Sequence, residues 1–158
     1  MNSKQILGAL TLLCGASGAS AQSAGQTVTF QVDAINQIAF SGNPSLVINA
    51  ATAGSAPSSA NAAATWAVTT NQSNAKITAS INAAMPANVT LTVTLVAPSG
   101  ATSTGAQSLG TVASDVVTGI TQVAQGALAV TYTLSATATA GVVASTTRTV
   151  TYTITGGT

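Results

Sequence analysis

Apolar and polar residues alternate with a period of two along most of the chain. The clearest stretch is residues 89–96, VTLTVTLV, where Val89, Leu91, Val93 and Leu95 fall on one side and threonines on the other. Successive side chains of a β-strand point to opposite faces of a sheet, so this period predicts a strand with one buried face. The solvent face of such a strand carries threonine instead of charged residues.

The same alternation recurs in other segments, and turn-forming residues such as Ser41-Gly42-Asn43-Pro44 separate them. No segment after residue 22 has the apolar spacing of an amphipathic helix. About seven to nine short strands at fairly even spacing predict an all-β chain with a single antiparallel β-sandwich of immunoglobulin-like type. The predicted strand segments are 26–35, 35–40, 44–49, 65–71, 76–82, 89–96, 126–138 and 147–155, with a less regular stretch at 106–120 and a mobile loop at 51–64.

The alternation also predicts which side chains form the core, because one face of every strand must be buried. Trp66 is expected to fill the middle of the sandwich, although a tryptophan can also serve as a binding platform. The expected inward residues are Val28, Phe30, Val32, Ile38, Val47, Trp66, Val68, Ile77, Ile81, Leu91, Val93, Leu95, Leu128, Val130, Tyr132, Val150, Tyr152 and Ile154.

The first residues have the layout of a secretory signal peptide. Lys4 precedes an apolar run from Ile6 to Cys14, and small residues ending in Ala21 follow. We expect residues 1–21 to be removed and residues 22–158 to form the sandwich domain. Lipid attachment at Cys14 and an uncleaved anchor are the alternatives. Export to the extracellular space or the surface of a bacterial cell follows, and the mature chain has no predicted transmembrane segment.

Charge is nearly absent from the predicted mature chain, which holds only Asp33, Lys76, Asp115 and Arg148. Charged residues make up 3% of the sequence, whereas a typical soluble domain has about 25%. Two cations do not form the basic stripe that nucleic acid requires, so nucleic-acid binding is not expected. A chain rich in Val, Ile and Thr is also unlike a disordered one.

Few residues of the sequence are of the types that carry out catalysis. The sequence has no histidine, and its one cysteine leaves with the predicted signal peptide. Nucleophilic catalysis lacks a base, and Asp33 and Asp115 show no pairing pattern for acid–base catalysis. We therefore expect no enzyme, no cofactor and no transition-metal site. The strongest metal candidate is a weak calcium site at Asp115 with Ser114 and Thr118.

Three weaker features have a structural and a functional interpretation. Asp33 and Arg148 lie near the starts of the first and last strand regions, so they either form a salt bridge or are two solvated rim charges. Asn71-Gln72-Ser73 and Asn88-Val89-Thr90 match the glycosylation triplet, which arises easily by chance in a chain this rich in Asn, Ser and Thr.

The uncharged threonine surface points to self-association. Charges on strands normally prevent sheets from pairing edge to edge, and a net charge near zero promotes association. The segment Thr27, Val28, Thr29, Phe30, Gln31, Val32 is near the mature N-terminus and apolar at alternate positions. It can pair within its own domain, or it can be donated to the sheet of a neighbouring copy.

Three stretches, QTVTFQVDAINQIAFSG, ATWAVTTNQSNAKITASINAAMP and TRTVTYTIT, resemble small exported bacterial β-sandwich proteins, most of them uncharacterised. The composition, poor in charge and rich in Ala, Thr, Val and Gly, is similar in style to fimbrial and pilin-type subunits, although the paired cysteines common in chaperone–usher subunits are absent. The resemblance implies an extracellular structural role and carries over no catalytic residue.

These observations predict a non-catalytic exported structural protein, a self-associating subunit of a surface, filament or extracellular matrix. Its expected partners are copies of itself in a homopolymer or components of the cell envelope. A monomeric extracellular binding module, for example for carbohydrate, is the alternative. It would need an exposed aromatic patch, for which Phe40 beside a turn is the main candidate. An enzyme-accessory or inhibitor domain is a third interpretation.

Overall fold

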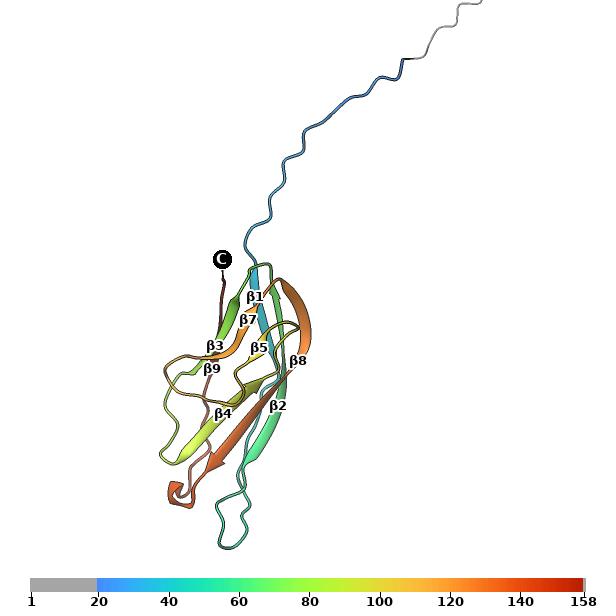
Figure 1. Cartoon of the computed structure of the whole chain (residues 1–158). Helices are drawn as coiled ribbons and strands as arrows, with labels where there is room; N and C mark the ends of the chain where they lie inside the picture. The colour runs from blue at the N-terminus through green and yellow to red at the C-terminus, as the bar shows by residue number, and fades with distance from the viewer. Residues whose placement is uncertain (1–19, 158) are drawn as a thin grey trace, which may run out of the picture. The chain divides into compact units, whose positions relative to one another are not determined.

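The computed structural model of the chain describes residues 20–157 (Figure 1). Residues 1–19 of the predicted signal peptide lie outside this range. The chain divides into a first unit ending at Val32 and a second unit beginning at Asp33. The described part of the first unit, residues 20–32, contains no strand or helix and is exposed along its length.

The second unit consists of two antiparallel sheets, which confirms the prediction of an all-β sandwich. The first sheet has the strand order β1-β2-β8-β4-β6. The two longest strands, β2 and β8, are neighbours in this sheet. Each has one apolar face, and pairing them turns both apolar faces toward the core and away from water. The bounds are β1 Asn36–Ser41, β2 Ala60–Thr70, β8 Val123–Ala136, β4 Val89–Leu95 and β6 Gln107–Ser108.

The second sheet has the order β5-β7-β3-β9. The last strand of the chain, β9, pairs only with β3 and therefore lies at the edge of this sheet. In the first sheet β1 occupies an edge in the same way, since it pairs only with β2. The bounds are β5 Thr102–Ser103, β7 Ser114–Ile120, β3 Ala75–Ile81 and β9 Val150–Thr155, with one 3₁₀ turn, η1, at Ala138–Ala140.

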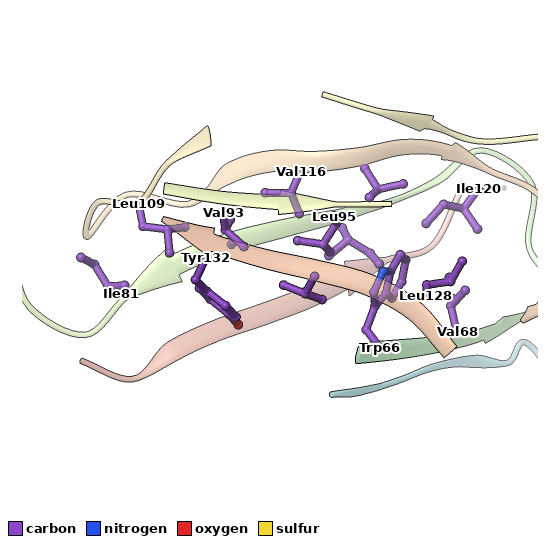
Figure 2. Close-up of a cluster of buried hydrophobic side chains, with 14 of the residues drawn as sticks. Trp66, Val68, Ile81, Val93, Leu95, Leu109, Val116, Ile120, Leu128 and Tyr132 are labelled. Atoms are coloured by element: carbon purple, nitrogen blue, oxygen red, sulfur yellow. The ribbon is translucent and has the colours of Figure 1, made fainter. Parts of the chain in front are cut away.

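The core lies between the two sheets, where Figure 2 shows side chains from both filling the space. Trp66 is 2% exposed, and its indole N–H donates to the Val96 carbonyl at 3.1 Å, so the ring is buried without leaving its polar atom unpaired. This confirms the structural interpretation of Trp66. The predicted core residues that are buried are Trp66, Val68, Ile77, Ile81, Leu91, Val93, Leu95, Leu128, Val130 and Tyr132, while Ile38, Val150, Tyr152 and Ile154 are half-buried.

Several core residues escaped the sequence pattern. Ala75 and Ala79 are fully buried on β3, where they lie between larger side chains. Val116 and Val117 are adjacent and both fully buried, which strict alternation forbids. The pairing of β7 with β3 shifts register on either side of Ile77, and such an irregularity lets consecutive residues face the core.

Two predicted strands are wrong. Residues 26–35 form no strand, and the first strand begins at Asn36. Val28, Phe30, Val32 and Val47 were expected inside the core but are exposed. Their pattern fits a strand, yet a strand exists only where a partner supplies hydrogen bonds.

The second wrong strand is the one predicted at 44–49, where the structure has no strand. Leu46 and Ile48 are the half-buried residues of this segment, so the inward parity is the opposite of the one that Val47 implied. The predicted loop at 51–64 is shorter than expected, because β2 begins at Ala60.

Candidate functional site

The segment Thr27–Val32 exposes apolar side chains to solvent. Val28, Phe30 and Val32 are 73%, 89% and 77% exposed. All three lie at alternate positions, so an extended backbone would place them on one face and Thr27, Thr29 and Gln31 on the other. Exposed apolar side chains scattered singly are common, but three in strand register form a ready-made strand face.

The sandwich carries a large apolar groove of about 1410 Å³. Residues 42–51, which follow β1, line one side, and residues 136–138 and 140–150, which lead into β9, line the other. Small-molecule sites usually measure about 300–1,000 Å³, so this groove is larger than such a ligand requires. An extended segment of six residues is about 20 Å long, and each of the two stretches of chain that line the groove is longer than six residues.

The floor of the groove consists of side chains that belong to the core. Leu91 and Tyr132 are buried there, and Met85, Val89 and Leu134 are half-buried. Among the residues lining the groove, Arg148 is the one that carries a charge. Its guanidinium donates to the Ala84 carbonyl through Nε at 3.1 Å and Nη2 at 2.9 Å. Two of its donor atoms are therefore already hydrogen-bonded within the same chain.

Both walls of the groove contain unpaired backbone. Within the described residues, 43–49 and 142–147 make no backbone–backbone hydrogen bond. The outer edge of β9 is likewise unpaired, since β3 is its one partner in the sheet. Unpaired N–H and C=O groups beside an apolar surface are the features that let a sheet accept a further strand.

Phe40 and Tyr152 line the groove, and their rings form an aromatic stack that continues to Trp66. The ring of Phe40 lies 3.8 Å from that of Tyr152 and 5.9 Å from that of Trp66, measured between ring centroids, with interplanar angles of 11° and 12°. Phe40 was expected as an exposed platform beside a turn, but it is half-buried in this stack. The stack joins β1 to β9 and so connects the edges of the two sheets.

The two tyrosines of the groove are hydrogen-bonded to each other, with 2.8 Å between the Tyr132 and Tyr152 hydroxyl oxygens. Burial raises the pKa of both phenols, because desolvation disfavours the phenolate. Both groups are therefore neutral over the physiological pH range. The groove thus combines an apolar floor with a neutral polar pair.

Lys76 and Asp115 form an ordinary surface ion pair. Lys76 Nζ lies 3.0 Å from Asp115 Oδ1, and the two side chains are 46% and 41% exposed. Asp115, the centre of the suggested calcium site, therefore has a lysine as its neighbour, and within residues 20–157 no three His, Cys, Asp or Glu side chains gather.

The two glycosylation triplets lie in different surroundings. The Asn71 amide is held by backbone groups of residues 33 and 35. The Asn88 side chain, just before β4, donates to the Thr139 carbonyl at 3.5 Å. The Asn71 amide is thus engaged by its own chain at both its oxygen and its nitrogen, which favours a chance match for this triplet.

Comparison with known proteins gives no assignment: no family model, no curated protein and no solved structure matches the chain. Over residues 20–157, the structure has no helix with the length and hydropathy that a bilayer crossing needs. The class that the fold supports is an all-β protein with a two-sheet antiparallel sandwich.

Proposed function

We propose that this chain is an exported, non-catalytic structural subunit that associates with its own copies by strand addition. In this proposal residues 27–32 of one copy enter the apolar groove of the next and pair with the outer edge of β9. The observation that carries it is complementarity. One part of the chain exposes a strand face without a sheet, and another part exposes a groove and sheet edges without a strand.

The strand order adds support. A constant-type immunoglobulin sandwich has strands A, B, E and D in one sheet and C, F and G in the other. If β1, β2, β3, β4, β8 and β9 are taken in chain order as A to F, these six strands have the neighbours of that arrangement, and β5, β6 and β7 are additional strands inserted between D and E. The place of the seventh strand, beside β9, then has no occupant from residues 33–157. This assignment makes the immunoglobulin-like type part of the proposal.

The chemistry of the two surfaces is compatible. The segment 27–32 contains no charged residue, and Arg148 is the one charged residue lining the groove. Insertion therefore desolvates apolar side chains and threonine hydroxyls, without burying an unpaired carboxylate or amine. Main-chain hydrogen bonds would give affinity, and the alternate side chains would set the register.

This mode of contact predicts the form of the assembly. The donated segment and the accepting groove are different parts of the molecule, so the interface is heterologous. A heterologous contact that does not close into a ring continues indefinitely, which gives an unbranched filament. A filament, a fibrous surface layer and an extracellular matrix all fit this unit, and the predicted signal peptide would bring it outside the cell.

Two variants test the proposal when mixed. Phe30→Arg places a charge on the donated segment and leaves the groove intact. Ile48→Arg places a charge in the groove wall, at a half-buried residue outside the set packed against the core, and leaves the segment intact. Each variant alone should remain monomeric in size-exclusion chromatography. An equimolar mixture should form heterodimers and stop there, because each pair has only one competent segment and one competent groove.

A heterodimer also shows that the Phe30→Arg sandwich is folded, because its groove accepts the segment, and circular dichroism checks the fold of Ile48→Arg. Wild-type protein that stays monomeric at high concentration, without polymers under the electron microscope, would contradict self-association. Such a monomer that binds a glycan would instead support the alternative of a monomeric binding module. Variants that polymerise alone as the wild type does would contradict the assignment of segment and groove.

A further inference from the structure

The side chain of Asn71 holds the stretch of chain between the exposed segment and β1. Asn71, which follows β2, donates from Nδ2 to the Asp33 carbonyl at 2.8 Å and accepts at Oδ1 from the Ile35 N–H at 2.8 Å. The Asn71 backbone N–H also donates to the Ile35 carbonyl at 3.2 Å. Gln72 Nε2 donates to Asn71 Oδ1 at 3.0 Å and holds the amide in place.

These contacts extend the pairing of β1 with β2 past the end of the sheet. In the strand register Asn36 is opposite Thr70, so Ile35 is opposite Asn71. The side-chain amide of Asn71 then bridges the residues on either side of Ala34, as a neighbouring strand would. A carbonyl and an N–H bound in this way are characteristic of extended backbone.

This extended linker bears on where residues 27–32 can pair. To pair with its own β1, the segment must reverse direction within Asp33–Ile35. A three-residue loop there would keep Val28 and Phe30 on the same face as Ile38 and Phe40, and would bring Thr29 opposite Ala39. Reversal requires the backbone of residues 33–35 to leave the extended conformation, which breaks both contacts of the Asn71 side chain.

We propose that Asn71 is a positioning residue that prevents the segment from pairing with its own β1 and so directs it to a second copy. This inference rests on the proposed function, because it concerns the choice between two partners for the same segment. Proline and charged residues usually block pairing at a free strand edge, and β1 has neither. Asn71 instead protects this edge from the segment of its own chain.

A disulfide reports directly on own-chain pairing, because the mature chain has no cysteine of its own. In the full mature chain, Thr29→Cys and Ala39→Cys are combined, and intrachain disulfide is measured on non-reducing gels after mild oxidation. We expect little intrachain product with Asn71 present. Adding Asn71→Ala should raise its fraction at least tenfold and deplete polymers in size-exclusion chromatography.

Two further variants control the result. Asn61→Ala removes the side chain that accepts a hydrogen bond from the Thr133 hydroxyl at the other end of β2, and it should leave the intrachain fraction unchanged. Ala34→Pro, added to Asn71→Ala, should restore polymers, because proline keeps the preceding residue extended. If Asn71→Ala fails to fold by circular dichroism, Asn71→Asp replaces it, since the carboxylate cannot donate to the Asp33 carbonyl.

The outcomes separate the two proposals. An equal intrachain fraction with and without the Asn71 side chain, in chains that still polymerise, would overturn this inference and leave the proposed function standing. A wild-type chain that forms no polymers would overturn the proposed function itself.

Discussion

The association of copies should depend strongly on the ring of Phe30. This side chain is 89% exposed in the described structure, so nearly all of its surface is available for burial when the segment enters a neighbour. Complete burial of a phenylalanine contributes about 1.5–3 kcal/mol. Phe30→Ala removes most of this gain, and we expect a loss of about 2 kcal/mol, which is about 30-fold in the dissociation constant.

The structure constrains the difference in dissociation constant between wild type and Phe30→Ala more closely than either absolute value. Ordering the segment and immobilising two copies cost free energy, but that cost is nearly the same for wild type and Phe30→Ala and cancels in the comparison. Phe30 is not part of the folded sandwich unit, which begins at Asp33. The variant should therefore unfold at the same denaturant concentration as wild type when both are monomeric.

Sedimentation velocity over a dilution series measures the effect. Thr29→Ala is the matched control, because it shortens a neighbouring side chain on the opposite face of the same segment. We expect Thr29→Ala to change the dissociation constant less than threefold, since a surface substitution rarely exceeds about 0.5 kcal/mol. Equal weakening by both substitutions, or no weakening by Phe30→Ala, would refute a one-sided insertion.

Three further predictions concern the sandwich itself. Trp66→Ala should lower the free energy of unfolding by about 3–5 kcal/mol in urea titrations followed by circular dichroism, because it empties a core position and leaves the Val96 carbonyl without its donor. Lys76→Ala should change stability by less than about 1 kcal/mol, since the ion pair with Asp115 is largely solvated; a larger loss would show an unexpected structural role. Burial raises the pKa of Tyr132 and Tyr152 above the ordinary value of 10.0, so the unfolded chain releases these protons first as pH rises. Stability should be flat below about pH 10 and fall above it, and Tyr132→Phe/Tyr152→Phe should flatten that decline in urea midpoints measured from pH 8 to 11.5.

The sequence by itself determined the architecture, because alternation is a local property that reports directly on burial. The segment 89–96 was predicted as a strand and β4 spans Val89–Leu95. The predicted segments 76–82 and 126–138 similarly match β3 and most of β8. Large β-branched and aromatic residues at alternate positions leave few ways to bury one face other than a sandwich.

Alternation could not tell a paired strand from an unpaired one. Residues 27–32 have the same pattern as β4, but a strand forms only where a partner distant in sequence pairs with it, and the described strands begin at Asn36. Alternation also did not predict the irregular pairing that buries both Val116 and Val117, or the burial of the small residues Ala75 and Ala79. Their burial follows from neighbours in space.

Only the tertiary structure revealed the candidate site. The groove exists because residues 42–51 and the stretch leading into β9 lie on opposite sides of a floor built from β4 and β8. Residues 42–51, β4 and β8 are far apart along the chain, and no local pattern records that a place beside β9 is open. Hydrophobic periodicity fixes which face of a strand is buried, whereas the order of strands decides which edges are left without a partner.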